Sequence, residues 1–291
     1  MISSNVGSNL YELINKNLFL FRYNKYKKDN IAYILHDPFT KTLTGIDFGD
    51  FAHTKKVTEM IERKYNSKLK YLISTHSHYD HTDGNKLWKK YRENTLQILG
   101  GYSPDQNDTI PYADKLYKEN QIISLSRNIN IKLIYTPGHM KSSYCFYLGK
   151  NSLFNKSMLF TGDTLYVGSI SKVYNGKYNE YYQSLLRIRN LKDKSALIMC
   201  AHDFTHSNLK FCYFVDSSNE TLHKIAARAY EKQKKNKLMV GISTLQEEIQ
   251  YNPFLRCDNE FYKKYTNQRK GEKVLEMLRT IKTSFDNWNK I

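Results

Sequence analysis

The segment Thr75–His81 concentrates side chains that could do chemistry within this chain of 291 residues. It reads Thr-His-Ser-His-Tyr-Asp-His and directly follows an apolar run. Residues two apart on an extended segment face the same way, so His76 and His78 are predicted to converge on one ion. Asp80 and His81 lie where the chain turns into a helix, and they are placed to serve a second ion beside the first. Imidazole and carboxylate are ligands that zinc, iron and manganese accept at catalytic sites.

The same arrangement recurs three times downstream, each time where an apolar run ends. These runs lead into His139, Asp163 and His202, each after a turn residue or a small residue. In α/β folds the carboxyl ends of strands are where ligand sites gather. The full set of candidate donors is His76, His78, Asp80, His81, His139, Asp163 and His202. Seven donors suffice for two ions with three terminal ligands each and one bridge, so the sequence predicts a two-metal site.

These motifs, written HxHxDH, PGH, GD and a strand-end His, resemble the signature of the metallo-β-lactamase superfamily. The resemblance implies an α/β fold of the αββα sandwich type. The ligand sets that it implies are His76, His78 and His139 for one metal, Asp80, His81 and His202 for the other, and Asp163 as the bridge. We expect two divalent metal ions, zinc in the first place, with iron and manganese as alternatives. Such a pair activates a bridging hydroxide at neutral pH, which makes Asp80 and Asp163 the catalytic residues.

Segments outside the metal motifs resemble one family of that superfamily, glyoxalase II, the hydroxyacylglutathione hydrolases. The segments that carry this resemblance are Leu159–Leu165, His202–Thr205, Asn208–Phe211, Ser243–Glu248 and Asn252–Arg256. The resemblance implies hydrolysis of the thioester S-D-lactoylglutathione to D-lactate and glutathione, the second step of methylglyoxal detoxification.

The resemblance also implies a set of residues that bind glutathione. A basic residue and a tyrosine after the bridging Asp correspond to Lys172 and Tyr174. An Arg and a Lys near the carboxyl terminus correspond to Arg279 and Lys282, whose i, i+3 spacing puts both on one face of a helix. Cationic groups there suit the carboxylates of a peptide-like thiol.

Two positions depart from the family pattern. Phe204 stands where the family has a tyrosine that contacts the ligand, so this substrate-binding position lacks a hydroxyl worth about 0.5–1.5 kcal/mol. Ser169–Ser171 replaces a stretch that contains glycine, which puts the path of that loop in question. Neither departure touches the metal ligands.

The alternation of apolar runs with polar turns predicts strands up to about Asp203. The predicted strands are Leu18–Tyr23, Ile31–Leu35, Thr44–Phe48, Leu69–Ser74, Ile131–Tyr135, Cys145–Leu148, Met158–Thr161 and Ala196–Cys200. Helical patterns lie between some of them, at Thr54–Lys64, Gly84–Tyr91 and Asn179–Asn190.

The last third of the chain has a helical pattern instead. We expect helices over Glu220–Lys235, Ser243–Gln250 and Lys273–Trp288, the second opening with a capping box of Ser243 and Gln246. Strands followed by helices indicate a catalytic domain over residues 1–205 and an all-helical substrate-binding domain over residues 206–291.

The chain is basic, with 45 Lys+Arg against 28 Asp+Glu and a formal net charge of +17, which favours anionic partners. The lysines are dispersed and form no run interleaved with aromatic residues, so we expect a small-molecule glutathione thioester and no nucleic acid. The longest apolar stretches fall short of the roughly 18 residues of a membrane span. We expect no membrane association and a monomer.

The cysteines have no paired spacing, so free thiols and a reducing compartment are expected. They are Cys145, Cys200, Cys212 and Cys257. Met1–Asn17 lacks the features of a secretory signal. We expect a cytoplasmic protein, or one of a plastid or mitochondrion if this segment is the remnant of a transit peptide.

Three alternatives remain. A persulfide dioxygenase shares the fold but uses a single iron, does not need the Asp80, His81 and His202 group, and lacks the Asn252–Arg256 segment. A metal-dependent nuclease of the same fold would fit the net charge, and its affinity would fall steeply with salt. A binding protein with an inert site is disfavoured by the intact set of donors.

Overall fold

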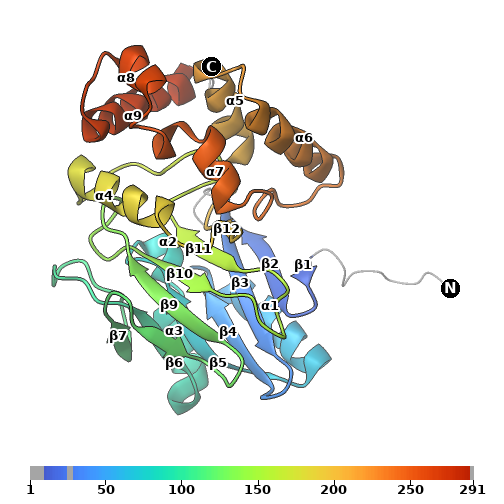
Figure 1. Ribbon diagram of the computed structural model, residues 1–291. Helices are drawn as coiled ribbons and strands as arrows, with labels where there is room; N and C mark the ends of the chain where they lie inside the picture. Colours follow the sequence, from blue (N-terminus) through green and yellow to red (C-terminus); the bar gives the residue numbers. More distant parts are fainter. Residues whose placement is uncertain (1–9, 25–28, 289–291) are drawn as a thin grey trace.

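Two β-sheets pack face to face in the computed structural model, which describes residues 10–24 and 29–288 (Figure 1). One sheet has the strand order β1-β2-β3-β4-β5-β6-β7 and the other β12-β11-β10-β9-β8. The first sheet consists of β1 (Glu12–Asn15), β2 (Leu18–Tyr23), β3 (Asn30–Asp37), β4 (Thr42–Ile46), β5 (Lys68–Ser74), β6 (Gln97–Gly101) and β7 (Lys115–Tyr117). The second consists of β8 (Ile122–Ser124), β9 (Asn130–Tyr135), β10 (Tyr144–Leu148), β11 (Met158–Gly162) and β12 (Leu197–Cys200).

Helices cover the outer face of each sheet. On the first sheet, α1 (Phe51–Tyr65) and α3 (Asn85–Arg92) bury Val57, Ile61 and Trp88 against apolar strand residues. On the second sheet, α4 (Tyr178–Arg189) packs its apolar face on β9, β10 and β11. A third apolar cluster fills the space between the two sheets. These layers confirm the predicted αββα sandwich.

The strand directions bring four loops to one edge of the sandwich. β4, β5 and β6 run parallel, and β9 and β11 are both antiparallel to β10 and so run in the same direction as each other. β12 is parallel to β11. Tyr144 N donates to Thr75 O at 3.0 Å and Ile31 N donates to Ala201 O at 2.8 Å, which ties the two sheets together where these strands end.

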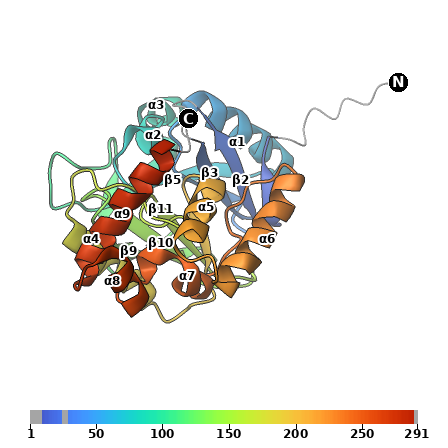
Figure 2. The ribbon, with the colours of Figure 1, turned by 90° about the horizontal axis from the view of Figure 1, so that it is seen from above.

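The helical third of the chain lies over that same edge, as both views show (Figures 1 and 2). Its elements are α5 (Thr205–Val215), α6 (Glu220–Lys234), α7 (Leu245–Tyr251), η2 (Pro253–Leu255), α8 (Glu260–Thr266) and α9 (Gly271–Trp288). α9 packs against α4, α5 and α8. The helices therefore form a layer above the loops that follow β5, β9, β11 and β12.

Each of the eight predicted strands overlaps a strand of the structure, and the six predicted helices are present. The strands β1, β6, β7 and β8 and the helices α2 (Tyr79–Thr82), α5 and α8 were not predicted, nor were η1 (Glu93–Thr95) and η2. The predicted capping box was wrong by one residue. Thr244 caps α7 with Glu247, because the Ser243 hydroxyl donates instead to Glu248.

All four cysteines are buried free thiols, as expected. Across residues 10–24 and 29–288, no helix combines the length and the apolar character needed to cross a membrane. Of the segment considered as a transit-peptide remnant, residues 1–9 lie outside the described residues and Glu12–Asn15 forms β1.

Glu248 on α7 joins the helical layer to the sandwich. Its carboxylate is fully buried and accepts hydrogen bonds from Gly168 N at 3.0 Å, Tyr251 Oη at 2.6 Å and Asn252 Nδ2 at 2.9 Å. Gly168 lies in the turn after β11 at φ +72°, a backbone conformation that favours glycine. One carboxylate thus anchors the turn that leads from the sandwich into the site.

Glu248→Ala is expected to lower the free energy of unfolding by about 3 kcal/mol, because it leaves several buried donors without an acceptor. Denaturant unfolding monitored by circular dichroism measures this. Glu247→Ala is the matched control, since Glu247 caps the same helix but is only partly buried, and it should cost about 1 kcal/mol. Equal losses in the two variants would contradict the anchoring role of Glu248.

Candidate metal centre

The seven predicted donors lie together at the edge where the strands end. Their ligand atoms form two groups, each with all atoms within 4.8 Å of one another. One group contains His76, His78, His139 and Asp163, and the other contains Asp80, His81 and His202. All but His78 are buried. Positions spread over more than a hundred residues of sequence therefore meet in one small volume.

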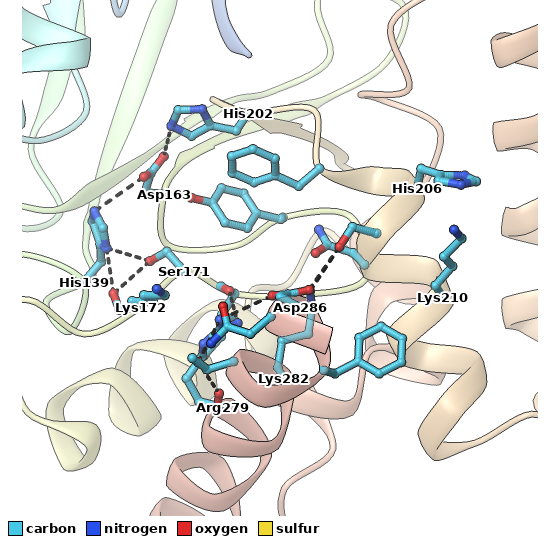
Figure 3. Close-up of a pocket in the computed structure, with 18 of the residues that line it drawn as sticks. His139, Asp163, Ser171, Lys172, His202, His206, Lys210, Arg279, Lys282 and Asp286 are labelled. Carbon is cyan, nitrogen blue, oxygen red and sulfur yellow. Dashed lines mark hydrogen bonds and ion pairs between the residues drawn. The ribbon is translucent and has the colours of Figure 1, made fainter. Parts of the chain in front are cut away.

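Asp163 lies between the two groups and turns one carboxylate oxygen toward each. Its Oδ1 is 3.2 Å from His202 Nε2 and 3.6 Å from His81 Nε2, whereas its Oδ2 is 3.5 Å from His139 Nε2 (Figure 3). A carboxylate shared in this way has the arrangement that a bridging ligand requires. Asp80 completes the second group, with Oδ2 at 3.6 Å from both His81 and His202.

Two local features of the chain, a short helix and a glycine, place these side chains. The short helix α2 begins directly after His78, so that Asp80 and His81 lie in its first turn. Gly162, just before Asp163, has φ +50°, and a Cβ atom there would lie 2.5 Å from Thr75 Oγ1. Only glycine therefore lets β11 pass close enough to Thr75 to bring Asp163 beside the histidines.

The Asp47 carboxylate is hydrogen-bonded to the segment Thr75–His81, and Asp47 was not among the predicted site residues. Its carboxylate accepts from Thr75 N and Thr75 Oγ1, both at 2.8 Å, and from His81 Nδ1 at 3.2 Å. Because Thr75 Oγ1 gives its proton to Asp47, it accepts from His76 Nδ1 at 3.0 Å. Asp47 is the residue directly after the end of β4, so a strand-end acidic residue was the signal that could have found it.

The ring of His139 is fixed by the loop that carries Lys172. His139 Nδ1 donates to the Lys172 carbonyl oxygen at 2.8 Å, and Ser171 Oγ lies 2.7 Å from the same nitrogen (Figure 3). A carbonyl oxygen can only accept, so Nδ1 carries the proton, and Nε2 keeps its lone pair and faces inward, 3.0 Å from His78 Nδ1. This is the tautomer that a metal ion requires. The loop with Ser169–Ser171 in place of glycine therefore packs against a candidate ligand.

Burial and mutual charge shift the titration of the cluster. Burial lowers the pKa of His139 to about 4 and, with the nearby His81, lowers the pKa of His76 well below its usual range. For His81, burial alone would lower the pKa, but the carboxylates of Asp163, Asp47 and Asp80 outweigh it and raise the pKa to about 9. His76 and His139 are thus neutral imidazoles at pH 7.

The donor set fits a divalent metal site. Among the buried side-chain atoms of the described residues that lack a hydrogen-bond partner is His81 Nε2, which points into the cluster. Buried polar atoms without a partner are costly, and a coordinated ion satisfies them. Imidazole with carboxylate is a ligand set of catalytic zinc, iron and manganese.

A cavity of about 580 Å³ opens beside this cluster, and all five predicted substrate-binding residues line it. Lys172 and Tyr174 lie on the loop after β11, and Phe204 directly precedes α5. Arg279 and Lys282 lie on α9, across the cavity from Lys172 (Figure 3). The cavity reaches His139, Asp163 and His202, so it connects the helical layer with the candidate metal ligands.

The two cations of α9 are held in place and largely hidden from solvent. Arg279 is 6 % exposed and donates to Ile170 O at 3.3 Å, and Lys282 is 2 % exposed with Nζ 2.5 Å from Asp286 Oδ1. Burial lowers the pKa of both cations. Two cations and one carboxylate leave this part of the cavity with a positive charge.

Aromatic rings line the side of the cavity next to the metal ligands. Phe204 stacks on His202 with centroids 5.0 Å apart, and the exposed Tyr174 ring meets His78 edge-on at 4.9 Å. Tyr166, which was not among the predicted site residues, meets the Phe204 ring edge-on, with centroids 5.7 Å apart. Burial and the nearby Asp163 carboxylate raise the pKa of Tyr166 well above its usual range, so its hydroxyl stays protonated.

Comparison with known proteins gives two family matches. Residues 42–202 match the metallo-beta-lactamase superfamily, and residues 203–285 match the hydroxyacylglutathione hydrolase C-terminus. The chain is 35% identical over 234 residues to a hydroxyacylglutathione hydrolase of Pelagibacter ubique (strain HTCC1062), covering 80% of this chain and 91% of that protein. It is 30% identical over 266 residues to the cytoplasmic hydroxyacylglutathione hydrolase of Arabidopsis thaliana, covering 90% and 96%.

Solved structures share the fold at low sequence identity. ETHE1 from Myxococcus xanthus has a TM-score of 0.60 at 18% identity and covers 90% of both chains. A metallo-beta-lactamase from Staphylococcus aureus subsp. aureus COL has a TM-score of 0.61 at 18% identity, covering 92% of this chain and 72% of that one. At such identities these two likenesses support the fold alone.

The titration of His81 predicts how the metal-free protein responds to pH. Its pKa of about 9 lies above the ordinary value of 6.5, so its stabilising charge is fully present below pH 6.5 and is lost as the pH rises through 9. Between these pH values, chelator-treated protein should lose about 3 kcal/mol of unfolding free energy. Thermal unfolding across this range measures the loss. His81→Gln should flatten this part of the profile, and an unchanged slope in that variant would contradict the assignment.

Proposed function

Because this chain belongs to the hydroxyacylglutathione hydrolase family of the metallo-β-lactamase superfamily, we propose that it hydrolyses the thioester S-D-lactoylglutathione to D-lactate and glutathione. This reaction is the second step of methylglyoxal detoxification. The observation that carries the proposal is a cavity with two buried cations that opens directly onto an intact set of metal donors.

The metal-dependent part of the proposal assigns every donor. One ion would be held by His76, His78 and His139, and the second by Asp80, His81 and His202, with Asp163 as the bridge. We propose zinc for both, with iron and manganese as alternatives that the same donors accept. A pair of bound divalent ions supplies a water of lowered pKa and draws electron density from a carbonyl oxygen. Asp80 and Asp163 would hold the two ions in place and are the proposed catalytic residues.

The remaining residues bind and orient the thioester. Arg279 and Lys282 would bind a carboxylate of the glutathione moiety through charge-assisted hydrogen bonds. Lys172 and Tyr174 would bind the peptide from the opposite wall, and Phe204 would offer an apolar face without a hydroxyl. The leaving group is a thiolate, which needs less help from a general acid than an amine or alkoxide does.

We further propose that residues 1–205 form the catalytic domain and residues 206–291 the substrate-binding domain. α9, which carries Arg279 and Lys282, belongs to the second of these. A monomer acting in the cytoplasm fits this arrangement, and the Arabidopsis thaliana relative carries the word cytoplasmic in its name. A plastid or mitochondrial location is the alternative.

A single-iron persulfide dioxygenase is not the function that the site favours. Such an enzyme does not need the group Asp80, His81 and His202, yet this group is intact and buried here. A nuclease would need cations that a phosphate backbone can reach, whereas Arg279 and Lys282 lie buried in a cavity.

Asp163→Ala should abolish turnover, since it removes the carboxylate that faces both groups of donors. We expect kcat for S-D-lactoylglutathione to fall at least about 100-fold, together with the content of bound metal. Steady-state hydrolysis and metal analysis of the same preparation test this. Asp193→Ala is the control, because Asp193 precedes β12 at the end opposite to His202. Full activity in the Asp163→Ala protein would reject the bridged site.

Arg279→Ala should weaken binding of the thioester and leave the chemistry intact. We expect KM to rise about tenfold with kcat nearly unchanged, because a charge-assisted hydrogen bond made equally in the ground and transition states is lost. Lys273→Ala on the same helix is the control, since the exposed Lys273 pairs only with Glu276 among the described residues. The assigned role fails if the KM of Arg279→Ala equals that of Lys273→Ala.

A further inference from the structure

The loop between β6 and β7 carries a buried carboxylate to which the reaction assigns no part. Asp108 is 3 % exposed although it lies in a stretch without regular secondary structure. Its neighbour Asp105 forms an ion pair with Lys141 at 3.0 Å near the surface. Within the described residues, by contrast, no lysine or arginine forms an ion pair with Asp108. Among the described residues, the charge of Asp108 is stabilised by hydrogen bonds alone.

Asp108 first joins the two histidine-bearing loops of one metal group. Its Oδ1 accepts from the hydroxyl of Ser77, the residue between His76 and His78, and from Ser142 Oγ at 2.6 Å. Its Oδ2 accepts from Ser142 N at 3.0 Å. Ser142 lies three residues after His139, and its Oγ also accepts from Ser77 N at 3.1 Å. The backbone of both loops is thereby set around one carboxylate.

The same carboxylate also holds the loop proposed to bind glutathione. Asn175 Nδ2 donates to Asp108 Oδ2 at 2.9 Å, and Asn175 Oδ1 accepts from Lys141 N at 2.9 Å. Tyr174, the preceding residue, donates its backbone N–H to His139 O at 3.1 Å and contacts the His139 ring edge-on at 5.2 Å. Asp108 and Asn175 thus fix the position of the loop that carries Tyr174 relative to the loop that carries His139.

The chemistry of these contacts requires an anion. Burial alone would raise the pKa of Asp108, but the hydrogen bonds from Ser142, Ser77 and Asn175 outweigh it and lower the pKa. Each of these partners donates, and a carboxylate accepts at both oxygens. An amide at this position would turn an NH₂ group toward at least one donor. Hydrogen bonds to a charged acceptor are also stronger than those between neutral groups.

We propose that Asp108 is a positioning residue that fixes His76, His78 and His139 relative to the Tyr174 loop, so that ion affinity and thioester affinity depend on one carboxylate. The thioester half of this inference rests on the proposed function, and the ion half does not. Partners outside the first coordination shell of a metal typically contribute 10- to 100-fold to its affinity. Asp108 acts through loops rather than on a ring nitrogen, so an effect near the lower end is expected.

The test compares Asp108→Asn with Asp105→Asn, two isosteric changes of the same charge in one loop. For Asp108→Asn we expect the Kd for Zn²⁺, measured by competition with a chromophoric chelator, to rise about tenfold for the more weakly held ion. KM for S-D-lactoylglutathione should rise several-fold in the zinc-saturated variant. Asp105→Asn should stay within about twofold of the unmodified protein in both, because exposed ion pairs contribute little.

Asn175→Ala separates positioning from a general loss of stability. This variant removes only the side-chain hydrogen bonds that hold the Tyr174 loop, so KM should rise while the Kd for Zn²⁺ stays unchanged. If Asp108→Asn fails to fold, Ser142→Ala removes one donor to the same carboxylate and should still weaken Zn²⁺ binding. A Zn²⁺ Kd in Asp108→Asn equal to that of Asp105→Asn overturns the proposal. Unmodified protein that binds Zn²⁺ but leaves the thioester intact would instead reject the proposed function.

Discussion

The rest of the structure depends on the burial of four imidazoles and two carboxylates in two adjoining groups, with His78 partly buried beside them. Burying ionisable groups is costly unless each is paired or hydrogen-bonded. The protein meets this cost by fixing the outward-facing nitrogen of His76, His81 and His139 with Thr75, Asp47 and the Lys172 carbonyl. The inward-facing nitrogens of His76 and His139 then keep lone pairs for a divalent cation, whereas His81 is protonated in the metal-free protein and must release its proton to bind one.

That constraint explains why the loops around the site are so closely joined. Three of the four loops that carry candidate metal ligands are held by a polar side chain from another element. Asp47 holds the segment after β5, and Asp108 holds the loops after β5 and β9. Glu248 holds the turn after β11 from the helical layer. The helices therefore do more than supply Arg279 and Lys282. They also fix the path of the chain from Asp163 to the loop that carries Lys172 and Tyr174.

The sequence was sufficient to predict the strands that lead into the site and the seven side chains that the structure brings together there, because each of them follows a buried apolar run that has its own local signal. The short strands β1, β7 and β8 have three or four residues and too little pattern to be recognised. Asp47, Asp108 and Tyr166 were missed for another reason, since their roles depend on partners distant in sequence. Ser243 was misassigned as a cap because nothing local reveals that Glu248 takes its hydroxyl.

The distribution of charge separates the two classes of anion that a basic protein could bind. The net charge of +17 comes mostly from dispersed lysines, which attract any anion weakly and are screened by salt. Arg279 and Lys282 differ from these because they are buried at the wall of a cavity of about 580 Å³. Phosphate-backbone binding typically uses exposed cations along a surface, whereas these two cations are almost fully buried. Desolvation also strengthens a charge-assisted hydrogen bond, so under the proposed function selectivity for a small carboxylate-bearing thioester would follow from where two cations lie rather than from how many there are.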